Sequence, residues 1–309
     1  MITVSLLCGL GNQLFQYAAA RALARHHGVE VRFDNSILEM TKNGQVEGVT
    51  PREYELYHFH VKTTGIGSYW PKANQVVVDK AKDIAIFENF FKKPDNSCLV
   101  GDWQNYRYAE KLRDEWLDTM RPTKPLSPMA DNMQKVAMES ESVFIHVRRG
   151  DYIRLARILD IDYYVRAMDM IKKEIPQPIF FLFSDDINWA INAFLEKNLL
   201  LPADKVYVSQ QPSSEGWQDL TVMSYCKHAV IANSSFSWWA AYWGMLRHEK
   251  INDKKMKKMV IAPKSAAVGI NPPRPKEGAP PPSPSPAEVA AIDQATYVSD
   301  FLLPEWHWI

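Results

Sequence analysis

Neither sign of charge is in excess in this sequence. Its 309 residues include 36 basic and 36 acidic side chains, so no overall field exists to hold a polyanion by counterion release. This balance argues against nucleic acid as the main partner.

Cysteine is scarce, and long apolar runs are missing. Cys8, Cys98 and Cys226 form no C-x-x-C pair and lie in or beside apolar runs, where a reduced, buried thiol is the commonest state. No stretch approaches the roughly 20 apolar residues that cross a bilayer, and the run from Ile2 to Leu10 has no basic leader. We therefore expect a cytoplasmic protein in a reducing compartment.

Spacing typical of metal ligands is also absent. His26-His27 and His58-x-His60 have no partner cluster at zinc-site spacing, so we expect no metal. A cluster of lysines could give peripheral contact with an anionic membrane at its inner face, although a solvated helix end explains it as well. Its members are Lys250, Lys254, Lys255, Lys257 and Lys258.

What the chain does have is enough apolar material for two cores. Apolar residues make up 46% and aromatic residues 12% of the sequence, and the length exceeds the usual domain size of about 100 to 200 residues. The proline-rich stretch Arg121 to Pro128 indicates a boundary, and we divide the chain into domains at 1–138 and 139–309. A second Pro-rich stretch predicts an extended insert at 271–287 that acts as a linker or surface loop.

The first half predicts few regular elements. Ile2 to Cys8 is a short apolar run, and Asn12 to His26 has the apolar spacing of a helix. Val29 to Phe33 predicts a second strand, and Tyr106 to Met120 predicts an amphipathic helix. The segment from Gly44 to Gly67 is too mixed to assign, so we expect an irregular connection there.

The second half alternates β-rich runs with helical stretches. Such alternation implies right-handed crossovers and a parallel sheet covered on both faces, which is a Rossmann-like α/β layer. The predicted strands are Val143 to Val147, Ile179 to Phe183, Val206 to Val208 and Ala229 to Ala232, and the predicted helices are Tyr163 to Lys173, Ile187 to Lys197 and Gln218 to Cys226.

The clearest chemical feature is the run HVRRGDY, from His146 to Tyr152, directly after a predicted strand. Ligands bind at the carboxyl ends of strands in open parallel sheets, and the planar fork of arginine suits phosphate oxygens. Arg148 and Arg149 could therefore neutralise a diphosphate leaving group without a metal. In the structural alternative, Asp151 simply pairs with an arginine; it is also the nearest carboxylate that could serve as a catalytic base.

A second feature, Asn233 to Trp239, follows another predicted strand. Ser234 or Ser235 would cap a helix that has Phe236 and Trp239 on one apolar face. A helix that begins at the end of a strand offers free N–H groups to a phosphate. The alternative is a plain N-cap before a tryptophan-rich core helix.

Two further carboxylates would lie at the same rim of the sheet. Asp219 could accept the N1–H and the amino group of guanine, or it could simply favour a helix dipole. Asp185, within Ser184-Asp185-Asp186, could belong to the nucleotide site or bind Mg²⁺ with its neighbour. Capping of the next helix is the simpler interpretation of this carboxylate pair.

The N-terminal run Gly9 to Leu14 admits a rival function. A predicted strand precedes it, a helix follows, and Asp34 lies about 20 residues on, as in dinucleotide-binding folds. Because a leucine replaces the third glycine of that fingerprint, we interpret Gly11, Asn12 and Gln13 as a close approach of the backbone to substrate. An NAD-linked oxidoreductase is the rival, and a non-catalytic binder of glycans or nucleotide sugars is a third alternative.

In several runs the chain resembles the α-1,2-fucosyltransferases of glycosyltransferase family 11. The part HxRRxD is shared more widely among α-1,2-, α-1,6- and protein O-fucosyltransferases, whereas the N-terminal run and SSFSWW are typical of the α-1,2 group. The runs are GLGNQLFQYAAARALA from Gly9, LVGDWQNYRYAEKL from Leu99, HVRRGDY from His146, FSDD from Phe183, NSSFSWWAAYWG from Asn233 and the ending DFLLPEWHWI.

This resemblance implies an α/β, GT-B-like fold with two facing Rossmann-like domains, the first for the acceptor and the second for GDP-fucose. It implies inverting transfer of L-fucose from GDP-β-L-fucose to the 2-hydroxyl of a galactose-ended oligosaccharide or lipid-linked glycan, without a metal. Where the family usually has an aromatic residue, this chain has Ser265-Ala266-Ala267. The implied roles are donor phosphate binding for Arg148 and Ser235, ribose or diphosphate contact for His146, and guanine recognition for Asp219.

Overall fold

The structure is a computed structural model. It describes residues 1–47, 50–69, 75–79, 87, 89–199, 205–251, 258–264, 274–275, 303 and 305–309. Apart from 274–275, the predicted insert 271–287 lies outside the described residues, as do 265–267 and the lysines at 254, 255 and 257. The chain divides into two compact units, Met1–Thr119 with Val268–Phe301 and Met120–Ala267 with Leu302–Ile309.

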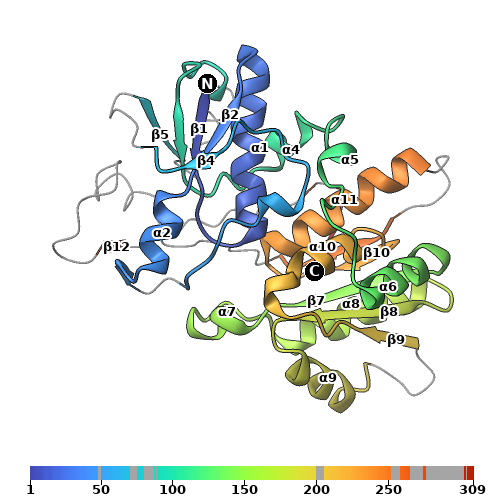
Figure 1. Cartoon of the computed structure of the whole chain (residues 1–309). Helices are drawn as coiled ribbons and strands as arrows, with labels where there is room; N and C mark the ends of the chain where they lie inside the picture. The colour runs from blue at the N-terminus through green and yellow to red at the C-terminus, as the bar shows by residue number, and fades with distance from the viewer. Residues whose placement is uncertain are drawn as a thin grey trace. The chain divides into compact units, whose positions relative to one another are not determined.

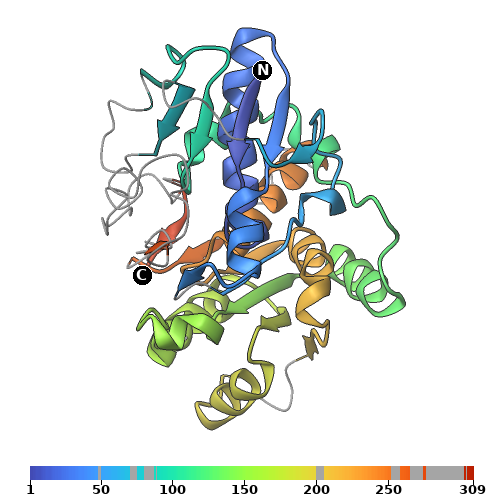
Figure 2. The ribbon, with the colours of Figure 1, turned by 60° about the vertical axis from the view of Figure 1, so that its left-hand side comes forward.

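The first unit contains a parallel sheet with the strand order β4-β2-β1-β6-β5. The long helix α1 (Leu10–His27) packs against β1 (Ile2–Ser5) (Figures 1 and 2). α1 ends at Gly28, which has the left-handed φ of 67° that glycine adopts without a steric cost. The other elements are β2 (Val31–Asp34), α2 (Ser36–Lys42), β3 (Val46–Glu47), η1 (Leu56–His58), β4 (Ile66–Gly67), β5 (Val76–Val78), β6 (Cys98–Val100), α4 (Tyr106–Glu110), α5 (Trp116–Thr119) and β12 (Arg274–Pro275), which pairs with β3.

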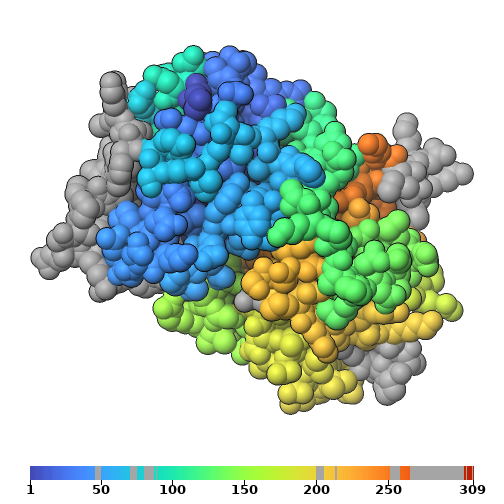
Figure 3. Space-filling model, in the orientation of Figure 1, coloured from blue at the N-terminus to red at the C-terminus, as the bar shows by residue number. Residues whose placement is uncertain are grey.

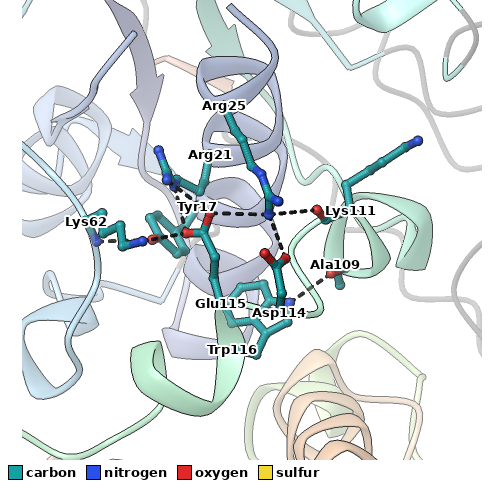
Figure 4. Close-up of polar contacts among 9 residues, drawn as sticks. All are labelled: Tyr17, Arg21, Arg25, Lys62, Ala109, Lys111, Asp114, Glu115 and Trp116. Carbon is teal, nitrogen blue, oxygen red and sulfur yellow. Dashed lines mark hydrogen bonds and ion pairs between the residues drawn. The ribbon is translucent and has the colours of Figure 1, made fainter. Parts of the chain in front are cut away.

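The predicted helix from Tyr106 to Met120 is wrong as a single element, because the chain turns between α4 and α5. The indole Nε1 of Trp116 donates a 2.8 Å hydrogen bond to the carbonyl of Ala109, a group that a continuous helix would use internally. Glu115 instead reaches α1, where its Oε2 lies 3.0 Å from Nε of Arg21 (Figure 4). Side-chain bonds to distant residues therefore outweigh the local helical pattern.

The second unit contains a parallel sheet with the order β13-β11-β10-β7-β8-β9; Figure 1 labels its strands β7 to β10. All four strands and all three helices predicted for this half are confirmed within a few residues at their ends, as is its Rossmann-like character. The elements are α6 (Pro128–Glu139), β7 (Ser142–Val147), α7 (Gly150–Arg154), α8 (Ile161–Glu174), β8 (Ile179–Ser184), α9 (Ile187–Glu196), β9 (Lys205–Val208), η3 (Ser213–Glu215), α10 (Gly216–Met223), β10 (His228–Val230), α11 (Ser235–Ile251), β11 (Val260–Ala262) and β13 (His307–Trp308).

The central strand β7 sorts its side chains onto two faces. Val143, Ile145 and Val147 join the core that α8 and α9 cover, so His146, which lies between two of them, points to the opposite face. On α11, Trp239 and Trp243 of the predicted apolar face are fully buried, and Trp238 and Ala241 outside that face are fully buried too, so the helix buries more than the predicted face. The interpretation of these tryptophans as core residues is confirmed.

Helix α6 falls in the second unit, whereas the sequence-based division at 138/139 assigned it to the first. It packs against α10 and β7. Its N-cap Ser127 is tied in as well, because its main-chain N–H donates a 2.7 Å hydrogen bond to the side chain of Gln218. Two parallel-sheet units in one chain are the α/β, GT-B-like class that the sequence predicted. Each helix in the described ranges is too short or too polar to span a bilayer.

Candidate functional site

The strand order of the sheet in the second unit reverses between β7 and β10. The chain adds β8 and β9 on one side of β7 and then returns to place β10 on its other side. In open parallel sheets, ligands bind outside the carboxyl ends of the strands at such a point. The motif that begins at His146 lies at the carboxyl end of β7, and the motif that begins at Asn233 follows β10. Because these two strands are neighbours, the structure brings the two motifs together.

Arg148 lies between two carboxylates. Its Nη2 donates a 2.6 Å hydrogen bond to Oδ1 of Asp151, and its Nη1 lies 3.0 Å from Oδ2 of Asp185. Burial alone would lower the pKa of Arg148, but Asp185 and Asp151 outweigh it and raise the pKa, so the guanidinium stays charged. The structural alternative for Asp151, a salt bridge to an arginine, is therefore what the structure contains.

Arg149 points in another direction from Arg148. Its Nε donates to Oδ2 of Asp186 at 3.1 Å, and its guanidinium lies 3.6 Å from the centre of the Trp189 ring on α9. Asp186 is the N-cap of α9, which confirms the capping interpretation of this carboxylate pair. Arg149 thus fixes the loop after β7 to the start of α9. Its main-chain N–H donates to Oδ1 of Asp185 at 2.8 Å, so Asp185 holds both arginines of the motif.

His146 is buried, and its ring lies 5.6 Å from that of Phe236. Burial, and then the charge of Arg148, lowers the pKa of His146 to about 3, so the imidazole is neutral near pH 7. Its Nδ1 is buried and has no hydrogen-bond partner in the part of the chain that the structure describes. Phe236 was predicted on the buried face of its helix, but it is partly exposed and faces this histidine.

The start of α11 has the capping geometry that its sequence predicts. Ser234 Oγ accepts a 3.4 Å hydrogen bond from the N–H of Phe236, so Ser234 is the capping residue and Ser235 is the first residue of the helix. Just before them, Asn233 donates from Nδ2 to the carbonyl of Arg157 at 2.8 Å. Its Oδ1 is buried and has no partner among the described residues.

Asp219 lies further along the rim. Its Oδ1 accepts a 2.5 Å hydrogen bond from Oγ of Ser209, the residue that follows β9. Two strand spacings separate β9 from β7, or about 10 Å, which a nucleoside diphosphate can bridge. Burial raises the pKa of Asp219 to about 7, although the bond from Ser209 lowers it in part.

Sequence reasoning missed three tyrosines that hold the strand ends in place. Tyr152 donates to the carbonyl of Asn233 at 3.1 Å, and Tyr164 donates to the carbonyl of His146 at 3.1 Å. Tyr163 donates to two carbonyls, at 2.7 and 3.1 Å, beyond β10 and at β11. The adjacent pair of tyrosines on α8 was visible in the sequence, but nothing local indicated which carbonyls they would bind.

In the first unit, Gly11, Asn12 and Gln13 form the first turn of α1 and not a loop. Gln13 is fully buried, and its Nε2 donates to the carbonyls of Cys8 and Glu53 at 2.8 and 2.7 Å. Its Oε1 accepts from a main-chain N–H at 2.9 Å, so every polar group of this side chain is used within the chain. Asn12 donates to Oδ1 of Asp102 at 3.1 Å.

The features that suggested a dinucleotide site are occupied by the protein itself. The N–H of Leu10, where a pyrophosphate would bind, donates to Oε2 of Glu55 at 2.9 Å. Asp34, the expected ribose ligand, accepts hydrogen bonds from both Ser5 and Ser36, at 2.6 and 2.5 Å. Both groups are engaged, so this geometry speaks against the oxidoreductase hypothesis.

The described residues contain no cluster of three or more His, Cys, Asp or Glu side chains suited to a metal ion. The expectation of a metal-independent reaction stays a prediction.

Known proteins similar to this chain are glycosyltransferases. The α-1,2-colitosyltransferase of Escherichia coli is 27% identical over 264 residues, which cover 78% of this chain and 87% of that protein. The O-antigen biosynthesis glycosyltransferase WbnK of Escherichia coli is 27% identical over 305 residues, which cover 85% of this chain and 94% of that protein. A crystal structure of POFUT1 in complex with GDP aligns with a TM-score of 0.47 and 12% identity, over 80% of this chain and 96% of that chain. The profile of glycosyl transferase family 11 matches residues 1–257, and the chain therefore belongs to that family, as its sequence motifs predicted.

Proposed function

We propose that this glycosyltransferase moves L-fucose from GDP-β-L-fucose to the 2-hydroxyl of a galactose-ended glycan, with inversion and without a metal. The observation that carries the proposal is the meeting of two motifs at neighbouring strand ends, an arginine motif after β7 and a serine-capped helix start after β10. Arginine side chains and the N-terminus of a helix at one rim suit a diphosphate. Family membership and the names of its relatives support a sugar nucleotide as the ligand.

In this proposal, Arg148 stabilises the diphosphate as it leaves, and the N–H groups at the start of α11 bind its oxygens. Neutral His146 can exchange a hydrogen bond with a ribose hydroxyl or a phosphate oxygen. Asp219 accepts the two donors on the edge of guanine, which adenine does not present in that arrangement. The nucleophile is the acceptor hydroxyl. Asp151 is the candidate for the base that takes its proton.

Turnover with defined sugars tests the proposal. The full chain is incubated with GDP-fucose and lactose, and released GDP is measured together with the linkage in any product. The expected product carries an α-1,2-linked fucose. An α-1,6 linkage or transfer to protein would replace the proposed regiochemistry with that of another GDP-fucose-dependent enzyme. Binding of GDP without release from GDP-fucose, across a panel of galactose-ended acceptors, would favour a non-catalytic binder.

The donor sugar is tested in parallel. GDP-colitose is included because one relative is named as a colitosyltransferase, and colitose is fucose without its 3-hydroxyl. We expect the higher kcat/KM with GDP-fucose. A rise in melting temperature with NAD, and none with GDP, would overturn the proposal in favour of the oxidoreductase.

A further inference from the structure

The charges of the arginine motif are already balanced within the protein. Arg148 pairs with Asp151 and Asp185, and Arg149 pairs with Asp186. Two guanidinium groups face three carboxylates, so these side chains alone carry a net negative charge. A diphosphate would be repelled by such a set unless another cation joined it.

Arg157, whose backbone lies at the rim between β7 and β10, is a candidate for this additional cation. It follows α7, and its side chain has no hydrogen bond or ion pair in the part of the chain that the structure describes. The residue is half-buried, and its Nη1 is a buried donor without a partner. A buried, unsatisfied donor on a charged group is costly, so such groups usually have a function.

The backbone of Arg157 is fixed at the rim between β7 and β10. Its N–H donates to the carbonyl of Tyr152 at 2.9 Å, and the N–H of Ala156 donates to the carbonyl of Ile153 at 3.2 Å. Ala156 has a left-handed φ of 52°. These two bonds form a Schellman motif that ends α7, with alanine at the position where glycine is usual.

Asn233 completes the attachment. Its Nδ2 donates to the carbonyl of Arg157 at 2.8 Å, and its own carbonyl accepts from the hydroxyl of Tyr152 at 3.1 Å. Arg157 is therefore tied to the residue that lies two positions before the start of α11. The Oδ1 of Asn233 is a buried acceptor without a partner among the described residues. An unused donor and an unused acceptor, on two residues that are hydrogen-bonded to each other, suit a ligand with acidic oxygens and hydroxyl groups.

We infer that Arg157 is a phosphate-binding residue of the donor site, which supplies the positive charge that Arg148 and Arg149 cannot supply alone. The inference rests on the proposed function and adds to it a residue outside the HxRRxD motif. The α7 segment lies at the molecular surface (Figure 3). Ile153 within it, and Leu155 and Ile158 after it, are exposed. A nucleotide can therefore approach this segment from solvent.

Calorimetric titrations with GDP and with guanosine test the inference. Arg157→Gln keeps a hydrogen-bond donor but shortens the side chain and removes the charge, and we expect it to weaken GDP binding by at least about tenfold. Guanosine binding, which involves no phosphate, should stay within about twofold of the wild type. Arg157→Lys should retain part of the GDP affinity. Arg166→Gln, at an exposed arginine of α8, is the matched control and should behave as wild type.

The outcomes separate the inference from the proposed function. If the wild type binds GDP and Arg157→Gln binds it equally well, the inference fails and the proposed function stands. Equal losses for GDP and guanosine would also overturn it, because they indicate a disturbed fold and not a lost phosphate contact. If the wild type binds neither ligand, the proposed function fails first and the inference fails with it.

Discussion

The carboxylate of Glu55 accepts a 2.9 Å hydrogen bond from the main-chain N–H of Leu10, the first residue of α1. The preceding residue, Gly9, has no side chain to cap the helix, so Glu55 supplies the cap from a distant part of the sequence. We predict that Glu55→Ala lowers the free energy of unfolding by about 1 kcal/mol, the usual effect of losing an N-cap. Urea denaturation of the purified chain measures this change.

Glu53 provides the control for Glu55. Its side chain is 76% exposed and pairs with Lys42 at 3.1 Å on the surface. Because exposed ion pairs contribute little, Glu53→Ala should change the free energy of unfolding by less than about 0.5 kcal/mol. Equal losses in the two variants would mean that the cap at Leu10 is not what stabilises this region.

Glu115, just before α5, lies among three cations, two of which are on α1 (Figure 4). Its carboxylate accepts two 3.0 Å hydrogen bonds from Arg21 and one of 3.1 Å from Lys62, and Arg25 lies 3.4 Å away. The Glu115 side chain is only 12% exposed. We predict that Glu115→Ala lowers the free energy of unfolding by about 2 kcal/mol, the usual value for a hydrogen bond to a charged group. Asp114→Ala is the control, since Asp114 is 65% exposed and should matter far less.

The same residue predicts a pH dependence of stability. Burial alone would raise the pKa of Glu115, but the hydrogen bonds from Arg21 and Lys62 outweigh it and hold the pKa below its ordinary value of 4.5. Its contribution is therefore fully present above that value and is lost as the pH falls through the lower pKa of the folded state. The gap in stability between wild type and Glu115→Ala should narrow in acid. A constant gap would contradict the assignment.

The two arginines of the motif should differ in effect. Arg148 lies at the rim proposed for the diphosphate, so Arg148→Ala should lower kcat/KM for GDP-fucose by about a hundredfold or more. Arg149 instead stacks on Trp189 and bonds to Asp186, so Arg149→Ala should lower stability and reduce turnover less. Steady-state kinetics and thermal unfolding distinguish the two. Retained turnover in Arg148→Ala, or a larger kinetic loss in Arg149→Ala, would reverse these roles.

Gly150 leaves room for the carboxylate that orients Arg148. A Cβ on Gly150 would overlap with Oδ2 of Asp185, the atom that lies 3.0 Å from Nη1 of Arg148. We predict that Gly150→Ala displaces Asp185 and raises the KM for GDP-fucose. Gly216→Ala is the control, because its new Cβ would lie 3.8 Å from the Phe236 ring, which is ordinary contact.

The same substitution in a chain that lacks the Asp185 carboxylate tests whether Gly150→Ala raises KM through Asp185. In an Asp185→Ala chain the carboxylate is gone, so adding Gly150→Ala should change KM no further. Additive effects of the two substitutions would show that Gly150 acts by another route.

Local pattern predicted the second unit well and the first unit poorly, for a physical reason. The strands β7 to β10 and helices α8 to α10 each carry their own periodicity, and their packing agrees with it. The break between α4 and α5 depends instead on the bond from Trp116 to Ala109 and on the pairing of Glu115 with Arg21. These are tertiary contacts, which overrule a helical pattern without leaving a sign in the segment itself.

In the candidate site, too, the sequence predicted the local features and missed those that depend on tertiary contacts. The sequence identified the two motifs and the cap at Ser234, because their residue types carry the chemistry. It did not predict that Arg149 points to α9, that Glu55 occupies the start of α1, or that the Arg157 side chain has no partner among the described residues. Each of these features depends on which residues from distant parts of the sequence the fold brings next to that side chain.

Asp219 should couple GDP binding to pH near neutrality. Burial raises the pKa of this carboxyl to about 7 from an ordinary 3.8. The folded state therefore favours the protonated form, and the contribution of Asp219 to the stability of the free protein is lost as the pH rises through about 7. Guanine recognition requires the opposite form, because only the carboxylate can accept both the N1–H and the amino group. GDP affinity should therefore increase over the same pH range in which this contribution to stability decreases.

The ratio of GDP to ADP affinity isolates that effect, since both nucleotides carry the same titrating diphosphate. We expect the ratio to rise with pH through about 7 in the wild type and to be low and flat in Asp219→Asn, whose amide offers only one acceptor oxygen. Ser209 donates to the same carboxylate at 2.5 Å, so Ser209→Ala should move the midpoint upward, because the lost bond favoured the charged form. A GDP to ADP ratio that is independent of pH in the wild type, or unchanged in Asp219→Asn, would place guanine recognition elsewhere.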